Sequence, residues 1–116
     1  MKKILLIGCG HMGSSLLECW ANSKNYKLVV VDPVKHKSLN LKYKNKKINF
    51  LKSISNVANF KQFDFVVLAI RPIDLNKVLN ELSNIKFEKK ITMVSVIAGK
   101  KIDQIKKKLK HINSFV

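Results

Sequence analysis

The chain alternates short apolar runs with segments in which apolar residues recur every three or four positions. The apolar runs predict buried strands at 3–7, 27–32, 48–51, 64–70 and 91–97. The recurring positions predict helices at 11–23, 72–85 and 102–112, a possible short one around Leu39 and Leu41, and a weak one near 53–60. Strands that alternate with helices favour a parallel sheet with right-handed crossovers.

This order of elements predicts an α/β fold, namely a Rossmann-like, doubly wound parallel sheet in a single domain. The length of 116 residues suits one domain, and a hydrophobic content of 47% is enough for a core. No apolar run approaches the roughly 20 residues that span a bilayer. The apolar stretch that opens the chain is also too short for a secretory signal, and Gly8 and Gly10 interrupt it. We therefore expect a cytoplasmic domain without a membrane partner.

The charge is strongly positive, with 23 basic residues against 7 acidic ones and a formal net charge of +16. Such a balance raises nucleic acid as a partner. All basic residues except Arg71 are lysines, however, and they are spread along the chain with abundant asparagine and isoleucine. Proteins that read nucleic acids rely on the bidentate guanidinium of arginine. The charge is thus typical of a solvated surface, and a basic module that binds nucleic acid is the alternative.

The cysteines and histidines do not form a metal-binding pattern. Cys9 and Cys19 lie ten positions apart, and no histidine stands at a ligand spacing from them. We expect two reduced thiols, Cys9 in a loop and Cys19 on a helix, and no metal.

The candidate chemistry lies in the glycine motif Gly8-Cys9-Gly10-His11-Met12-Gly13, which follows the first strand and opens the first helix. In such a motif, Gly8 makes the tight turn, Gly10 allows the backbone to approach a pyrophosphate, and Gly13 lets the helix pack close to the strand. The N-terminus of the helix offers free N–H groups to the phosphates. The motif predicts a dinucleotide site.

Asp32 ends the second strand, nineteen residues after Gly13, where an acidic residue can accept hydrogen bonds from the adenosine ribose. A carboxylate there favours NADH, because it repels the 2′-phosphate of NADPH. Lys35, His36 and Lys37 follow almost at once and could offset that repulsion. The cofactor is therefore NAD(P)H, and the preference for NADH that Asp32 suggests stays open.

Two more loops lie at the carboxyl ends of predicted strands, at the edge where open α/β sheets bind ligands. One contains Ala69, Ile70, Arg71 and Pro72, and the other contains Val96, Ile97, Ala98 and Gly99. Their small residues would let a nicotinamide ribose lie against the backbone, although proline and glycine are also ordinary in such connections.

In this order, these segments resemble the N-terminal domain of pyrroline-5-carboxylate reductase. IGCGHMGSSLL is similar to the family's opening IGxGNMGxAL, DFVVLAIRP to its DxVxLAVKP segment, and MVSVIAGKKIDQIKKKL to its VSxxAG element. Related hydroxyacid and prephenate dehydrogenases share the first segment but usually not the other two. His11 and Arg71 stand where the family usually has asparagine and lysine, which we expect to tune affinity.

The resemblance implies a set of cofactor-binding residues. Ile7 to Met12 would hold the pyrophosphate, Asn56 would reach the adenosine half, and Ala69–Pro72 with Val96, Ile97 and Ala98 would line the nicotinamide side. The implied reaction is hydride transfer from the reduced nicotinamide to the protonated C=N bond of 1-pyrroline-5-carboxylate, which yields proline. A protonated imine needs no strong general acid, and we assign no catalytic residue.

The resemblance also implies a missing part. Family members continue into a helical domain that dimerises and forms the substrate pocket, whereas this chain ends at HINSFV, which resembles the start of a further strand. We expect a shortened chain that binds dinucleotide, is inactive alone, and has an edge through which copies could associate. The alternative within enzymes is the cofactor domain of another imine or hydroxyacid dehydrogenase.

Overall fold

The computed structural model describes residues 2–44, 47–85, 87, 91–97, 102–109 and 114–115. Its centre is a sheet of parallel strands in the order β3-β2-β1-β4-β5-β6. The strands are β1 (Lys2–Ile7), β2 (Tyr26–Val31), β3 (Asn49–Leu51), β4 (Phe65–Leu68), β5 (Thr92–Ser95) and β6 (Ser114–Phe115). This is the strand order of a Rossmann fold, in which the chain winds outward from β1 in both directions. The predicted doubly wound parallel sheet is confirmed.

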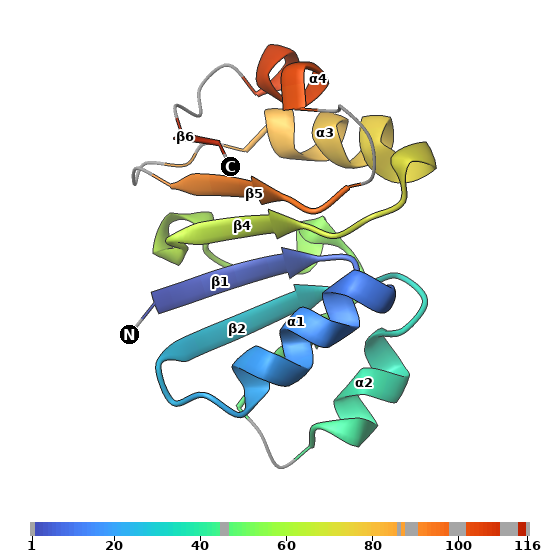
Figure 1. The fold of residues 1–116 in the computed structure, drawn as a ribbon, viewed down its shortest axis with the longest axis vertical. Coiled ribbons are helices and arrows are strands. Elements are labelled where there is room, and N and C mark those ends of the chain that lie inside the picture. Colours follow the sequence, from blue (N-terminus) through green and yellow to red (C-terminus); the bar gives the residue numbers. More distant parts are fainter. Residues whose placement is uncertain are drawn as a thin grey trace.

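The helices cover both faces of this sheet (Figure 1). They are α1 (His11–Ala21), α2 (His36–Lys42), α3 (Leu75–Ser83) and α4 (Ile102–Lys108). On one face, Leu17 of α1 packs with Ile4, Leu6, Leu28 and Val30, and Leu39 of α2 lies against the same cluster. On the other face, α3 and α4 bury Leu79, Leu82 and Ile105 against the alternate residues of the strands. Because successive side chains of a strand point to opposite faces, the central strands are apolar where both faces are covered, at 4–7 in β1 and 28–31 in β2.

The structure shortens most predicted elements by one or a few residues but keeps their type. The best predicted strand, 64–70, is observed as β4, with Val66, Val67 and Leu68 buried. Pro72 begins a 3₁₀ turn, Pro72–Asp74, that leads into α3. The HINSFV segment supplies β6, as its likeness to a strand predicts. Within the described part of the chain, no helix combines the length and the apolar character needed to cross a membrane.

The weak helix predicted near 53–60 is wrong. Two 3₁₀ turns, Ile54–Asn56 and Phe60–Gln62, stand in its place between β3 and β4. Ser53 caps the first turn, and Val57 at its end has an extended backbone, which stops the helix. Buried Ile54, Val57 and Phe63 fasten the connection to the sheet, so tertiary packing overrides the weak helical pattern.

Candidate functional site

The loops after β1, β2, β4 and β5, which carry most of the predicted site residues, lie at the edge of the sheet where the parallel strands end (Figure 1). Three backbone hydrogen bonds join the loops there: Gly8 N to Val31 O at 2.8 Å, Ala69 N to Ile7 O at 2.9 Å and Val96 N to Leu68 O at 3.0 Å. The loops after β1, β2, β4 and β5 are therefore neighbours. The direction of winding reverses between β1 and β4, which is where open α/β sheets bind their ligands.

Gly8 makes the turn that the sequence predicts. Its φ of 91° is in a region that L side chains rarely adopt. A Cβ atom built there would lie 2.6 Å from the carbonyl oxygen of Ala69. The loop after β1 therefore rests directly on the end of β4.

The other two glycines of the motif differ in their surroundings. A Cβ at Gly13 would lie 2.6 Å from the carbonyl oxygen of Gly8, so α1 packs tightly on its own loop. A Cβ at Gly10 would meet nothing within 4 Å. Open space thus lies in front of Gly10, where the backbone could receive a flat or extended group.

The first turn of α1 supplies hydrogen-bond donors to this space. The first hydrogen bond of the helix runs from Ser14 N to Gly10 O at 2.8 Å. The N–H groups of His11, Met12 and Gly13 precede it and have no acceptor within the helix. Free N–H groups of this kind, together with the helix dipole, can bind an anion such as a pyrophosphate. The side chains of His11 and Met12 are exposed beside it.

The carbonyl of Cys9 is held from two sides. Lys35 Nζ donates to it at 3.0 Å, and Ser14 Oγ donates to it at 3.2 Å. The backbone N–H of Cys9 donates to Asp32 Oδ2 at 2.9 Å. These three hydrogen bonds fix the shape of the glycine loop. Ser14 was not among the predicted site residues, and only its position one turn after Gly10 could have indicated this role.

Asp32 is only 8% exposed. Among the residues that the structure describes, it is the one with a charged or polar side chain that is buried. Besides Cys9 N, its carboxylate accepts hydrogen bonds from Val34 N and Lys35 N, both at 2.9 Å onto Oδ1. An aspartate that bonds the backbone two and three residues further on is a common turn signal. The sequence thus contains a turn signal at Asp32, although the acidic position at the end of β2 predicts a contact with the ribose.

The other predicted residues differ in accessibility. Ala69, Ile70 and Val96 are half-buried at the edge, whereas Ile7, Ile97 and the Cys9 side chain are buried and would offer backbone only. Arg71 and Pro72 are exposed, and Arg71 Nε pairs with Asp74 Oδ2 at 3.1 Å. Asn56 is exposed, and its Oδ1 accepts a hydrogen bond from Ser53 N at 3.1 Å. The N–H groups of its side-chain amide therefore remain available to a ligand. Ala98 lies outside the described residues.

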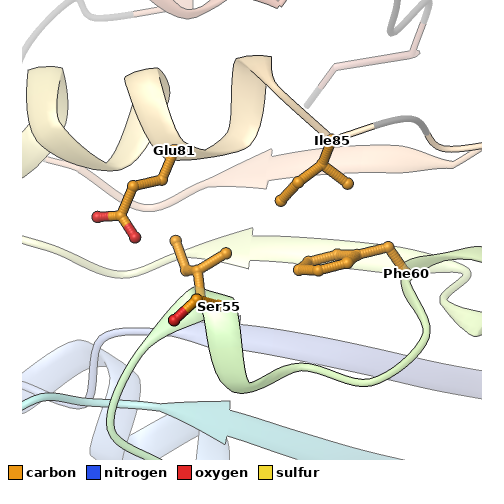
Figure 2. A pocket seen from close by; sticks show the side chains of 5 residues that line it. Ser55, Phe60, Glu81 and Ile85 are labelled. Atoms are coloured by element: carbon orange, nitrogen blue, oxygen red, sulfur yellow. The ribbon is translucent and has the colours of Figure 1, made fainter.

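A separate hollow of about 250 Å³ lies between the 3₁₀ turns and α3. Figure 2 shows its lining side chains, which come from Ile54, Ser55, Phe60, Glu81 and Ile85. None of the predicted site residues lines it.

Cys9 and Cys19 are both free thiols, the first buried and the second exposed on α1. Burial raises the pKa of the Cys9 thiol above its ordinary value, and the nearby Asp32 carboxylate adds to the rise. Among the residues the structure describes, no three His, Cys, Asp or Glu side chains gather in a way that could hold a metal ion.

We expect iodoacetamide at neutral pH to modify Cys19 at least about tenfold faster than Cys9, because reaction needs an accessible thiolate. Mass spectrometry of the two peptides over time measures the rates. The Cys19→Ser variant is the control and should leave one slowly reacting thiol. Equal rates would contradict the burial of Cys9.

These features are typical of a Rossmann-fold domain with a dinucleotide-type glycine loop. The chain belongs to the family described as NADP oxidoreductase, coenzyme F420-dependent, which matches residues 3–99. No curated protein sequence matches it.

Solved structures with the same fold include pyrroline-5-carboxylate reductases. The reductase from Coxiella burnetii is 27% identical, with a TM-score of 0.67 over 91% of this chain and 39% of its own. The Plasmodium falciparum enzyme with NADP bound is 24% identical, with a TM-score of 0.68 over 93% of this chain and 38% of its own. Prephenate dehydrogenase from A. aeolicus, in complex with hydroxyphenyl propionate and NAD⁺, is 23% identical, with a TM-score of 0.72 over 99% of this chain and 40% of its own.

The expected resemblance to the N-terminal domain of pyrroline-5-carboxylate reductases is thus confirmed. The chain spans about two fifths of the length of these proteins.

Proposed function

We propose that this chain is the cofactor-binding half of a pyrroline-5-carboxylate reductase. The observation that carries the proposal is the open space at Gly10, which faces the free N–H groups at the start of α1. A pyrophosphate fits there because it is anionic and needs close approach to backbone. The residues present thus suit the cofactor.

The other loops support the same assignment. A dinucleotide whose pyrophosphate lies at Gly10 would extend toward the end of β2 with its adenosine half. Its nicotinamide half would extend toward the loops after β4 and β5, where Ala69 and Val96 are half-buried. We assign Ile7–Gly13, Asp32, Lys35, Asn56, Ala69–Pro72 and Val96–Ala98 to the cofactor site.

When bound, the reduced nicotinamide would supply a hydride to the C=N carbon of protonated 1-pyrroline-5-carboxylate, and the product is proline. The chain's own contribution is to bind and orient the cofactor, and we assign it no proton-transfer residue. The combination of AIRP after β4 with SVIAG, which begins at the last residue of β5, favours this reductase over hydroxyacid dehydrogenases, which share the fold. Two free thiols suit a reducing cytoplasm.

The substrate pocket would come from a further helical domain, since the related reductases are more than twice as long. We therefore expect this chain by itself to bind NAD(P)H and to turn over pyrroline carboxylate poorly or not at all. Readily measurable steady-state reduction by the chain alone would contradict this division of labour.

Titration with NADH and NADPH at about 150 mM salt tests the proposal. Trp20 is the only tryptophan, and it lies half-buried on α1, which begins at the proposed pyrophosphate site. We expect saturable energy transfer from Trp20 to bound reduced nicotinamide. Absence of binding by both dinucleotides, in a sample whose circular dichroism shows the α/β fold, would overturn the proposal. Binding of oligonucleotides that persists at this salt concentration would instead favour the basic module.

A further inference from the structure

The hollow between the 3₁₀ turns and α3 has a polar side and an apolar side. Figure 2 shows the Glu81 carboxylate and the Ser55 hydroxyl on one side of it, and the Phe60 ring and Ile85 on the other. Ile54 also lines it and is 4% exposed, so the hollow reaches down to the hydrophobic core. Such a space suits a molecule that combines a polar group with an apolar body.

Glu81 is the charged residue that lines this hollow, and its side chain is half-buried. Among the residues that the structure describes, no hydrogen bond or salt bridge reaches its carboxylate. Lys77 stands one turn earlier on α3, at a spacing that allows an ion pair, yet these two described side chains form none. Glu81 instead extends toward the 3₁₀ turn that carries Ser55 (Figure 2). Taking a charge partly out of water costs free energy, which a bound cation would offset.

The Ser55 hydroxyl offers a second acceptor to the same cation. Its Oγ lies 2.7 Å from Ser53 Oγ, and either oxygen could be the donor. A hydroxyl oxygen has two acceptor lone pairs, so Ser55 Oγ keeps at least one whichever way that bond runs. The capped 3₁₀ turn, Ile54–Asn56, holds this hydroxyl in place. The polar side of the hollow therefore presents acceptors and a negative charge, which match an ammonium group that has only donors.

The apolar side of the hollow is formed by Phe60 and Ile85, which are half-buried and pack against the core. The Phe60 ring contacts two further rings edge-on, with centroid distances of 6.4 Å to Phe63 and 5.7 Å to Phe87. These contacts fix its position. A small ring or alkyl group placed here would cover apolar surface that the chain leaves partly exposed, which is favourable in water.

We propose that this hollow binds a small organic cation, whose ammonium group pairs with Glu81 and Ser55 and whose apolar body lies against Phe60 and Ile85. The volume of about 250 Å³ suits roughly eight non-hydrogen atoms, at about 30 Å³ for the space that one water molecule takes. The net charge of +16 repels cations from the chain as a whole, so a preference for a cation must come from this local carboxylate. The proposal does not depend on the proposed function, because no residue assigned to the cofactor site lines the hollow.

Titration of the full chain with benzylammonium, at about 150 mM salt, tests the proposal. Benzyl alcohol has the same size and no charge, and it is the neutral comparison. We expect benzylammonium to bind with a dissociation constant on the order of 1 mM, and about tenfold more tightly than the alcohol, which is the size of one charge-assisted contact. In proton–nitrogen correlation spectra, the backbone signals of Ser55, Phe60, Glu81 and Ile85 should shift saturably with that constant.

Glu81→Gln removes the charge and keeps the size of the side chain. It should lower the affinity for benzylammonium about tenfold, to that of benzyl alcohol, and leave the alcohol unchanged. Glu18→Gln is the matched control, because it removes an exposed carboxylate of the same type from α1, on the other face of the sheet. It should leave both affinities unchanged. The same spectra report whether each variant is folded.

The outcomes decide for or against the carboxylate at the hollow. Equal affinities of the amine and the alcohol, or no saturable shift with either, would overturn the proposal. A preference for the amine that survives in Glu81→Gln would overturn it too. Shifts centred on other residues, or equal losses in Glu18→Gln and Glu81→Gln, would mean that the cation binds acidic groups in general, which also contradicts it. Failure of the same sample to bind dinucleotides would overturn the proposed function and leave this inference standing.

Discussion

Gly8→Ala is expected to lower the free energy of unfolding by about 2–4 kcal/mol, which is a large share of the stability of a small domain. Two causes act together. The backbone of Gly8 has a φ of 91°, which costs energy for any residue with a Cβ. That Cβ would also lie 2.6 Å from the carbonyl oxygen of Ala69 and 2.8 Å from Cγ2 of Ile70. Because the first of these is backbone, the end of β4 would have to move.

Urea denaturation followed by Trp20 fluorescence and circular dichroism measures this loss. Gly10→Ala is the matched control in the same loop, since its Cβ would meet nothing within 4 Å and the φ of Gly10 is −75°. A Gly8→Ala variant as stable as the control would show that the turn after β1 is not held as described.

The same Gly10→Ala variant is expected to lower the affinity for NADPH and NADH on the order of 100-fold, with a change in stability within about 1 kcal/mol. The added methyl group would occupy the space where the pyrophosphate must approach the backbone. Two charge-assisted hydrogen bonds lengthened or lost account for that factor, at roughly 1.5–3 kcal/mol each. The open space at Gly10 therefore explains both expectations: the methyl group leaves the folded state undisturbed, and it blocks the approach of the pyrophosphate.

The dinucleotide titration measures this effect directly. Ser15→Ala serves as the control on α1, because the exposed Ser15 hydroxyl only donates to the carbonyl of His11. It should bind both dinucleotides like the parent chain. Undiminished binding by Gly10→Ala would mean that the pyrophosphate binds elsewhere. The open space at Gly10 would then no longer support the proposed function.

The glycine motif shows which structural roles can be predicted from local sequence. Its position between an apolar run and a helical pattern was enough to assign a separate task to each glycine. The structure agrees at Gly8, with its positive φ, and at Gly13, with its close contact to the loop. Glycine can be interpreted in this way because its special conformations and close approaches are local demands on the backbone.

Asp32 shows what local sequence does not predict. The sequence predicts Asp32 as a ribose ligand, whereas in the structure its carboxylate accepts the backbone N–H groups that organise the turn. The contact with Cys9 N joins residues 23 positions apart, and no local pattern contains it. Likewise, the segment at 53–60 has a weak helical pattern, but burial of Ile54 and Val57 against the sheet decides its conformation.

The sequence by itself determined the alternation of strands and helices, the parallel sheet and the loops that carry the site, because hydrophobic period and glycine placement act over a few residues. Only the tertiary structure decided which side chains remain free to meet a ligand. That depends on hydrogen bonds and burial between distant segments, which hold Asp32 inward and place the ammonium group of Lys35 beside the glycine loop.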